Sequence, residues 1–279
     1  MSEQVIIDSG ATKSDWRVLA PDGRQLRQTI RSGMNVSAMR LEDVRSTLLE
    51  GLKAENLPHA KGVYLYTAGV VTDEIRRELE AAIREAAPES EIDIQDDLMG
   101  AARAVCGHGS GIVAILGTGS NTCFYDGITL TRKVYSGGYV IGDEGGGACL
   151  GKLFLADFIK GLVPEPVAGE FAEKHDASYQ AIVEGVYRSP SPSGYLGSIA
   201  PFLLERKDNA YVKSLIESNF RAFIERALLK YDTANYPVGI VGGFGRACQE
   251  ILTPLLEEYD IKVKCFLKAP VEGLIKYYI

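Results

Sequence analysis

One arrangement constrains the fold of this chain more than any other, because it occurs twice. Each copy has a run of apolar residues, a short turn of glycine and small polar residues, and a second run; the copies span residues 5–19 and 112–126. The pattern predicts two strands joined by a tight turn. Glycines leave the N–H groups of the turn accessible, which suits a phosphate that approaches the main chain. A single copy is equally consistent with an ordinary hairpin, but the repeat favours two similar phosphate-binding domains.

Length and charge exclude several classes of protein. The chain has 279 residues, enough for one large domain or for two of about 100–200 residues each. Its net charge of −7 argues against nucleic-acid binding, which usually requires a basic face. No uninterrupted apolar run is long enough to span a membrane, so no membrane partner is expected. The first residues, MSEQVIID, lack the features of a signal peptide, so we expect a cytoplasmic protein.

The cysteines and histidines show no metal-binding pattern. The cysteines are widely scattered, and none forms a C-x-x-C pair; they are Cys106, Cys123, Cys149, Cys248 and Cys265. The three histidines are also isolated. This distribution indicates reduced, mostly structural thiols and argues against a zinc or iron–sulfur site.

Strands and helices alternate over the first hundred residues. Apolar residues recur at helical spacing from Leu41 to Leu52, and residues 63–66 form a short apolar run. Thr72 is followed by acidic residues, which suits the start of a second helix. A strand at 91–95 then leads into an alanine-rich helix. The alternation predicts an α/β sheet with helices packed on it.

The glycine-rich residues 107–111 mark the expected boundary between two domains. The segments expected beyond the second strand pair are helices at 148–160, at 209–231 and from about Arg246, strands at 238–241 and 261–267, and a short tail.

Three familiar motifs lack support: two that bind nucleotides and the nucleophile elbow of hydrolases. Residues 146–152 have the spacing of a P-loop, but the next residue is Leu153, which cannot bind magnesium, and no strand precedes them. No G-x-G-x-x-G stands between a strand and a helix, and no G-x-S-x-G is present. A nicotinamide-dependent enzyme and a hydrolase with a nucleophile elbow are therefore disfavoured.

Four motifs follow one another along the chain. They are D-x-G-x-T-x-S at 8–14, G-T-G-S-N at 117–121, G-D-E-G at 142–145, and a strand ending in G-G-x-G at 238–245. In this order they resemble the sugar kinases of the sugar-kinase/actin superfamily, most closely the N-acetylglucosamine-kinase branch, which also contains the ATPase activators of radical dehydratases (the BadF/BadG type). The resemblance spans nearly the whole chain.

The resemblance implies an α/β fold of two actin-like, ribonuclease H-like domains, with an ATP- and sugar-binding cleft between them. The N-terminal domain would comprise residues 1–108 and the C-terminal domain residues 109–279. The last residues would be free to pack back on the first domain.

The resemblance also assigns the ATP-binding residues. The two strand-turn motifs would hold the phosphates from opposite domains, and the late glycine pair would let adenosine lie against the main chain. Asp8 matches the acid that sits near Mg²⁺, so ATP and Mg²⁺ are the implied cofactors; the rival reading of Asp8 is a turn former. The implied ATP and phosphate contacts are Asp8, Gly10, Ala11, Thr12, Lys13, Thr118, Gly119, Gly242 and Gly243.

Asp97 matches the catalytic base of the family. Such a carboxylate accepts the proton of a sugar hydroxyl as its oxygen attacks the γ-phosphorus. Asp97 could instead be a plain N-cap, and Asp96 beside it leaves the register of the base open. Asn35 could be a loop residue without a ligand, and Asp143 could cap a helix. The implied sugar contacts are Asn35, Asp97, Asn121, Gly138 and Asp143.

Three stretches depart from the family pattern. Residues 135–138 place glycine where relatives carry Leu or Trp beside the sugar, and Gly146 stands where many members have Ser. Val70 and Val71 replace a hydrophilic sugar loop, and we expect them to pack on an acetyl methyl group, a contact worth roughly 1 kcal/mol. The stretches expected around the sugar contain no basic residue to pair with the lactyl group of N-acetylmuramate.

The predicted function is transfer of the γ-phosphoryl group of ATP to the 6-hydroxyl of N-acetylglucosamine. Glucosamine and N-acetylmuramate are the alternative acceptors, and the oligomeric state, with a homodimer as one option, and the metal preference stay open. An ATPase that activates a partner enzyme would need cysteines for an iron–sulfur cluster, and their spacing here offers no such signature. A sugar-sensing regulator would carry a DNA-binding segment, for which we expect no room before Val5.

Overall fold

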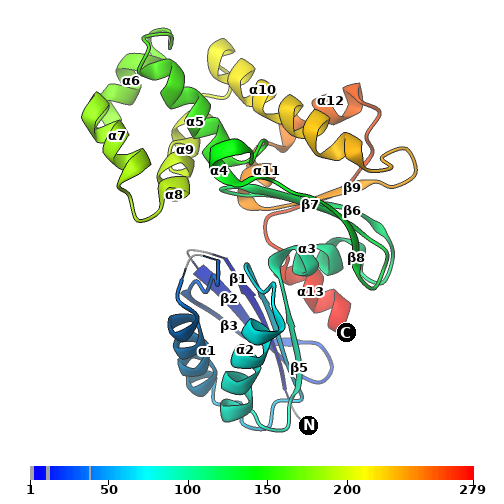
Figure 1. Ribbon diagram of the computed structural model, residues 1–279. Coiled ribbons are helices and arrows are strands. Elements are labelled where there is room, and N and C mark those ends of the chain that lie inside the picture. Colours follow the sequence, from blue (N-terminus) through cyan, green and yellow to red (C-terminus); the bar gives the residue numbers. More distant parts are fainter. Residues whose placement is uncertain (1–2, 11–12, 38) are drawn as a thin grey trace. The chain divides into compact units, whose positions relative to one another are not determined.

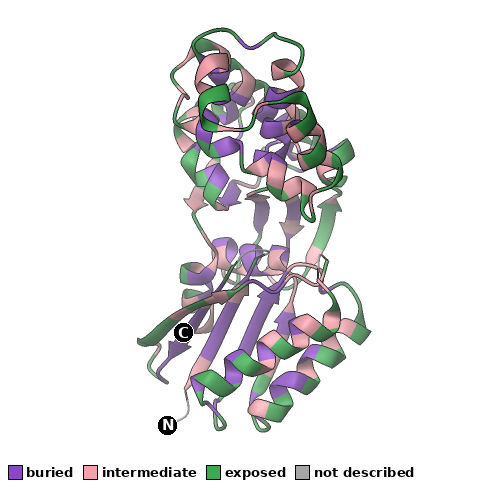
Figure 2. Cartoon of the chain, turned by 90° about the vertical axis from the view of Figure 1, so that its left-hand side faces the viewer, coloured by how far each residue is buried: buried purple, intermediate pink, exposed green. Residues whose placement is uncertain are grey.

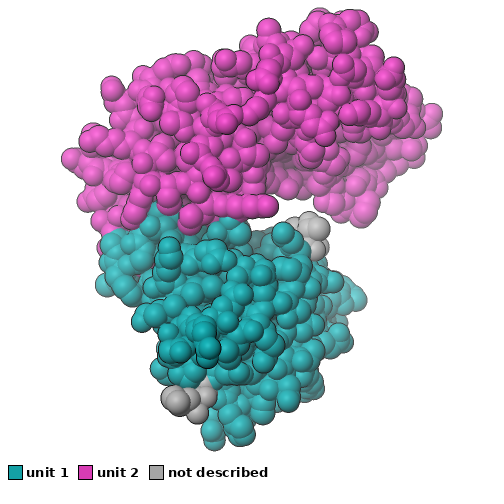
Figure 3. Space-filling model, turned by 180° about the vertical axis from the view of Figure 1, so that it is seen from behind, with its two compact units in different colours: residues 1–109, 127–129, 269–279 teal, residues 110–126, 130–268 magenta. Residues whose placement is uncertain are grey.

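A computed structural model describes residues 3–10, 13–37 and 39–279. The chain divides into two compact units (Figure 3). Unit 1 contains residues 1–109, 127–129 and 269–279, and unit 2 contains residues 110–126 and 130–268. Each unit has its own five-stranded sheet with helices packed on it, so the prediction of an α/β fold is confirmed.

The sheet of unit 1 has the strand order β3-β2-β1-β4-β5 (Figure 1). Strands β1 to β3 pair antiparallel, whereas β4 and β5 run parallel to β1. Its strands are β1 (Gln4–Ser9), β2 (Lys13–Leu19), β3 (Gln25–Ser32), β4 (Gly62–Thr67) and β5 (Glu91–Gln95). Its helices are α1 (Leu41–Glu55), α2 (Asp73–Ala86), α3 (Asp97–Cys106) and α13 (Val271–Tyr278).

Unit 2 repeats this topology with the strand order β10-β9-β6-β7-β8. Strands β6 to β8 are antiparallel, and β9 and β10 run parallel to β6. Its strands are β6 (Gly111–Leu116), β7 (Ser120–Tyr125), β8 (Leu130–Val134), β9 (Val238–Val241) and β10 (Val263–Leu267). Its helices are α4 (Gly138–Ile141), α5 (Gly147–Phe158), α6 (Val167–Lys174), α7 (Tyr179–Tyr187), α8 (Pro192–Gly197), α9 (Ala200–Leu204), α10 (Ala210–Arg226), the 3-10 helix η1 (Leu228–Lys230), α11 (Gly243–Ala247) and α12 (Gln249–Glu258).

The alternation of side chains along β1 explains why helices cover both faces of the sheet in unit 1. Val5 and Ile7 pack in the core formed with α1 and α2, whereas Ile6 packs in a smaller cluster with Leu274 of α13. All three are fully buried, as expected for the central strand of a covered sheet (Figure 2). Helix α2 begins where the sequence predicts, because the Thr72 side chain accepts a hydrogen bond from the N–H of Ile75 at 3.3 Å.

The C-terminal helix α13 is anchored to unit 1 by a polar network. The hydroxyl of Tyr278 lies 2.6 Å from that of Tyr66 and donates to Asp93 at 2.9 Å. Arg103, on α3, donates to the Tyr66 hydroxyl at 2.7 Å and pairs with Asp93. The ring of Tyr278 also stacks on that of Tyr64. Helix α3, which begins at Asp97, is thereby held between the sheet and the end of the chain.

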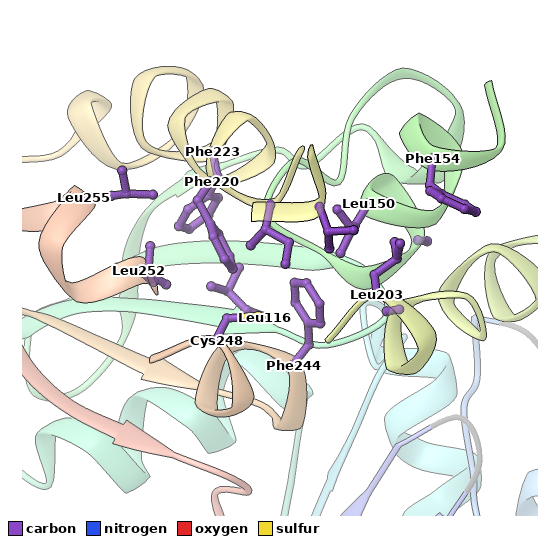
Figure 4. Packing of buried hydrophobic residues seen from close by; sticks show 14 of the residues in the cluster. Leu116, Leu150, Phe154, Leu203, Phe220, Phe223, Phe244, Cys248, Leu252 and Leu255 are labelled. Carbon is purple, nitrogen blue, oxygen red and sulfur yellow. The ribbon is translucent and has the colours of Figure 1, made fainter. Parts of the chain in front are cut away.

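The core of unit 2 joins its sheet to α5, α9, α10 and α12 (Figure 4). Leu116 at the end of β6 and Phe244 of α11 pack in this core together with Phe220 and Phe223 of α10. The end of β6 and the start of α11 are thus fixed by close packing. The predicted ATP contact Thr118 lies in the turn that follows β6, and Gly243 is the first residue of α11. Among the described residues, no helix combines the length and the apolar character that a bilayer crossing requires.

Three features differ from what the sequence predicts. Strands β3 and β8 were not expected, because their residues are mostly exposed and give little apolar alternation. The long helix expected at 209–231 ends at Arg226 and gives way to a 3-10 turn. The expected short tail is instead the helix α13.

Candidate active site

The first strand-turn motif places Asp8 in a group of charged side chains. Asp8 lies directly opposite Asp15 in the β1–β2 ladder, so both side chains are on the same face of the sheet. Burial raises the pKa of Asp8 to about 7, and the negative charges of Asp15 and Asp97 add to this effect, against the opposing charge of Lys13. Asp8, Lys13 and Asp97, three predicted site residues, are therefore neighbours within unit 1.

The negative charge of Asp15 is compensated by hydrogen-bond donors on neighbouring side chains. Arg17 donates to Asp15 through Nε at 2.7 Å and through Nη2 at 3.0 Å, and Gln28 also donates to this carboxylate. The turn is closed by the N–H of Gly10, which donates to the carbonyl of Lys13 at 3.0 Å. Ala11 and Thr12, which are predicted phosphate contacts, lie outside the described residues.

The structure distinguishes Asp96 from Asp97. Asp96 is the N-cap of α3, and its carboxylate accepts a hydrogen bond from the N–H of Met99 at 2.8 Å. Asp97 is the first residue of the helix. A β-carbon at Gly100 would lie 2.8 Å from the ring of Tyr66, so glycine lets α3 pack closely on β4. The capping role falls to Asp96, which keeps Asp97 as the predicted base.

Asn35 lies in a loop between β3 and α1 and is half-buried. Its side-chain oxygen accepts a hydrogen bond from the N–H of Ser37 at 2.9 Å, a local turn that uses part of its hydrogen-bonding capacity.

The predicted role of Val70 in a sugar contact is wrong, because Val70 is 4% exposed and belongs to the core of unit 1. Val71 is 77% exposed, so the predicted contact with the acetyl group stays a prediction for Val71 alone.

In unit 2, the turn between β6 and β7 is joined to the start of α5. The carbonyl of Gly117 accepts a hydrogen bond from the N–H of Gly147 at 2.9 Å, and that of Thr118 accepts from Ala148 at 2.8 Å. These bonds satisfy N–H groups that the first turn of a helix cannot pair internally. The carbonyls of Gly117 and Thr118 thus fix the turn to the start of α5.

Gly119 and Asp143, two predicted ligand contacts, touch each other. A β-carbon at Gly119 would lie 2.7 Å from the carboxylate of Asp143, which accepts a hydrogen bond from the N–H of Ser120 at 3.3 Å. Burial raises the pKa of Asp143, and the hydrogen bonds from Ser120 and Ser136 oppose this effect. Asp143 has a φ of 57°, a left-handed conformation that aspartate tolerates better than most residues. Asp143 thus links the G-D-E-G motif to the phosphate turn.

Asn219 of α10 supports the G-D-E-G motif and was missed by sequence reasoning. Its side chain is buried, accepts from the N–H of Gly145 at 2.9 Å and donates to the carbonyl of Gly146 at 3.2 Å. A β-carbon at Gly146 would lie 2.8 Å from the carbonyl oxygen of Thr118. This close approach is a structural reason for glycine at position 146.

Gly138 opens the short helix α4, in the loop that departs from the family pattern. Gly137 and Gly138 both have positive φ values, 78° and 70°, and glycine adopts this conformation without strain. Lys152 of α5 donates to the carbonyl of Tyr139 at 2.9 Å and so ties α4 to α5. Glycine at both positions thus lets this loop adopt two consecutive left-handed conformations.

A pocket with a volume of about 390 Å³ lies beside the turn of unit 2. Thr118 and Gly243, both predicted ATP contacts, line it together. Its wall is mostly apolar and includes residues from α8 and α9 that carry no recognisable motif. The lining residues are Gly117, Thr118, Gly147, Gly197, Ala200, Pro201, Leu204, Gly243 and Phe244.

The two glycines of the late motif have different roles. Gly242 has a φ of 126°, and a β-carbon there would collide with the carbonyl of Leu116. A β-carbon at Gly243 would meet no atom within 4 Å. Gly242 is thus required by the fold, whereas Gly243 leaves space open on the pocket.

Asn121 is half-buried, and its side-chain oxygen accepts from the N–H of Thr122 at 3.1 Å. It lines a small cavity with a volume of about 40 Å³, far below the roughly 390 Å³ of the pocket beside the turn. Among the described residues, no three His, Cys, Asp or Glu side chains form a group that could hold a metal ion.

A scan against protein-family models finds no match, and a search of curated proteins finds none. Solved structures do match. A provisionally named N-acetylglucosamine kinase from Porphyromonas gingivalis is 34% identical, with a TM-score of 0.91 over 100% of this chain and 98% of that chain.

Two further structures share less sequence. A provisionally named N-acetylglucosamine kinase from Chromobacterium violaceum is 20% identical, with a TM-score of 0.80 over 100% of this chain and 99% of that one. A ROK family glucokinase from Streptomyces griseus, solved with glucose and AMPPNP, is 14% identical, with a TM-score of 0.56 over 99% and 98%. These matches confirm the predicted fold of two actin-like domains. At 34% identity over its whole length, the chain belongs to the N-acetylglucosamine-kinase-like branch of the sugar-kinase/actin superfamily.

Proposed function

We propose that the protein is an ATP-dependent kinase that phosphorylates the 6-hydroxyl of N-acetylglucosamine. The observation that carries the proposal is the group of Asp8, Lys13 and Asp97 in unit 1, in a chain whose solved relatives bear the names of sugar kinases. Phosphoryl transfer needs a positioned carboxylate for the hydroxyl proton and a site that neutralises phosphate charge. Asp97 and Asp8 provide carboxylates for these two tasks.

The pocket of unit 2 suits the nucleotide. Its volume of about 390 Å³ and its mostly apolar wall are typical of a small-ligand site. We assign the base and ribose to the wall formed by Leu204, Gly243 and Phe244, with the phosphates toward the turn at Thr118. Gly243, like Gly117, is a lining residue at which an added β-carbon would meet no atom within 4 Å, so both leave room for the ligand.

Asp8 fits a magnesium site because burial, and after it the negative charges of Asp15 and Asp97, raise the pKa of its carboxyl group, and a bound cation would favour the ionised carboxylate. Mg²⁺ is usually bound by one or two carboxylates together with the phosphates of the substrate. We therefore assign Asp8 as the protein ligand of Mg²⁺. The ion would neutralise the charge of the phosphates during transfer.

In the proposed reaction, Asp97 accepts the proton of the 6-hydroxyl while the sugar oxygen bonds to the γ-phosphorus. The bond from the γ-phosphorus to the bridging oxygen breaks, and ADP leaves with that oxygen. Asn35, Asn121, Gly138 and Asp143 remain the proposed sugar contacts, with Val71 beside the acetyl group. The cytoplasmic location and the homodimer remain predictions from the sequence.

A coupled assay of ADP release tests the proposal directly. The panel is N-acetylglucosamine, glucosamine, N-acetylmuramate and glucose, each with ATP and Mg²⁺. We expect a kcat/KM for N-acetylglucosamine at least about tenfold above those for glucose and N-acetylmuramate, because polar groups that bind the acetamide stay unpaired with glucose. Comparable turnover of glucosamine or N-acetylmuramate would change the substrate but not the class of reaction. ADP release that needs no sugar would favour the ATPase activator instead.

A further inference from the structure

Three segments of unit 1 meet at the main chain of Met34. Ser9 ends β1, Thr67 ends β4, and Met34 lies in the loop that carries Asn35. The N–H of Met34 donates to the Ser9 hydroxyl at 2.7 Å, and the Ser9 hydroxyl donates to the carbonyl of Met34 at 3.0 Å. The hydroxyl of Thr67 donates to the same carbonyl. Two side chains thus bind both polar groups of one peptide residue.

All three residues are deeply buried: Ser9 is 1% exposed, and Thr67 and Met34 are fully buried. A buried main-chain N–H or carbonyl without a partner is costly, so the two hydroxyls stabilise the loop in this position. The two hydroxyls therefore provide the hydrogen bonds that a neighbouring strand would provide if this part of the loop were paired in the sheet.

The loop is also held on the other side of Asn35. The N–H of Val36 donates to the carbonyl of Ala68 at 3.0 Å, one residue beyond Thr67. Gly69 has a φ of 89°, and a β-carbon there would collide with Ser37. Asn35 is therefore flanked by two attachments to the ends of β1 and β4.

We propose that Ser9 and Thr67 are positioning residues that fix Asn35 for the sugar, and that their hydroxyls set the affinity of the kinase for its acceptor. The inference rests on the proposed function, because it takes Asn35 as a sugar contact. Ser9 directly follows Asp8, so the same strand end carries the proposed magnesium ligand and an anchor of the sugar loop. The strand ladder on both sides of β1 holds Asp8 without the Ser9 hydroxyl.

The chain offers a matched control in Ser90. Its side chain is 2% exposed, and its hydroxyl donates to the carbonyl of Ala60 at 2.6 Å. Ala60 precedes β4, whereas Thr67 ends it, so the two sites lie at opposite ends of that strand, about 20 Å apart at the usual rise per residue. Loss of the Ser90 hydroxyl removes a comparable buried hydrogen bond far from Asn35.

The experiment compares five full-length proteins: the parent, Ser9→Ala, Thr67→Val, Thr67→Ser and Ser90→Ala. For each we measure the melting temperature and the kcat and KM for N-acetylglucosamine and for ATP. We expect Ser9→Ala and Thr67→Val to raise the KM for the sugar by about three- to tenfold, as for the loss of a hydrogen bond, with the KM for ATP within about twofold of the parent. Thr67→Ser, which keeps the hydroxyl, should restore the parental KM. Ser90→Ala should lower the melting temperature similarly and leave the KM for the sugar unchanged.

Other outcomes overturn the inference. If Ser9→Ala and Thr67→Val melt earlier but keep the parental KM for the sugar, the hydroxyls only stabilise the fold. If Ser90→Ala raises this KM equally, the effect is a general loosening of unit 1. If Ser9→Ala does not fold, Thr67→Val and Thr67→Ser decide alone. A parent protein that phosphorylates no sugar of the panel refutes the proposed function itself, and the inference falls with it.

Discussion

Asp8 in β1 and Asp97 at the start of α3 are electrostatic neighbours within unit 1. Burial is the largest cause of the raised pKa of Asp8, followed by the charge of Asp15 and then by that of Asp97. Asp15 is paired with Arg17, so Asp8 and Asp97 are the two carboxylates here to which we assign chemistry. Their proximity couples the proposed magnesium ligand to the proposed base.

The first prediction concerns the base. Asp97→Asn should lower kcat by about 10²–10⁴, because general-base catalysis is lost, and should leave the binding of sugar and ATP largely intact. Turnover measurements combined with calorimetric titration of both ligands check this. A mutant that turns over within a few-fold of the parent would remove the role from Asp97.

Asp96→Asn is the matched control for that variant. Asparagine caps helices about as well as aspartate, so the bond to the N–H of Met99 should persist. We expect a melting temperature and a kcat close to those of the parent. A large fall in kcat for Asp96→Asn, with activity retained in Asp97→Asn, would assign the base to Asp96.

The second prediction is a pH dependence of stability without divalent cations. The pKa of Asp8 is about 7 in the folded protein and near the ordinary aspartate value of 3.8 in the unfolded chain. Between these values the folded state binds the extra proton, so the free energy of unfolding should decrease as the pH rises from about 4 to 7. Above pH 7 both states are ionised, and the contribution of this group stays lost.

Asp8→Asn isolates this contribution. The variant lacks the titrating carboxylate, so its gain in stability over the parent should be larger at pH 8 than at pH 4. Urea unfolding at both pH values, with EDTA present, measures the difference. An equal effect of the substitution at both pH values would show that the pKa of Asp8 is not raised.

The third prediction separates the two glycines of the late motif. Gly243→Val should place a side chain in the pocket beside Phe244, where its β-carbon meets no protein atom within 4 Å, and should raise the KM for ATP by about tenfold or more. The melting temperature and the KM for the sugar should change little. Gly242→Ala should instead lower the melting temperature, because its φ of 126° excludes a side chain. An unchanged KM for ATP in Gly243→Val would mean that the nucleotide does not use this pocket.

The fourth prediction concerns the departure at Gly146. Gly146→Ser should destabilise the protein by about 1–3 kcal/mol, because the new β-carbon would press on the carbonyl of Thr118. Denaturant unfolding measures this. Gly109→Ser is a suitable control, since a β-carbon there makes only an ordinary contact with the carbonyl of Cys106 at 3.4 Å. If both variants unfold alike, the close approach of Gly146 to Thr118 is not the reason for glycine at this position.

The sequence predicted features that depend on neighbours along the chain. Both hairpins, the cap at Thr72 and the helix that begins beside Asp97 follow from local chemistry, and the structure has each of them. The edge strands β3 and β8 escaped prediction because exposed strands carry little apolar alternation. The helix α13 also escaped prediction, because it is short and only two of its residues, Val271 and Leu274, are buried.

Roles that arise from contacts distant in sequence were not predicted. Asn219 lies 74 residues after Gly145, and only the fold brings its amide to that turn. The part of the pocket wall formed by Gly197, Ala200 and Leu204 consists of small or apolar residues without chemical signal. Val70 was assigned to the sugar because its burial in the core could not be read from its neighbours.

Identification of the product tests the central claim most directly. The parent protein is incubated with ATP, Mg²⁺ and N-acetylglucosamine, and the product is examined by two-dimensional ¹H–³¹P correlation spectroscopy. The proposed function predicts an ATP-dependent phosphate monoester, formed together with ADP, whose phosphorus couples to the two protons on carbon 6. Coupling to the anomeric proton instead, or a phosphorus signal from inorganic phosphate alone, would contradict it.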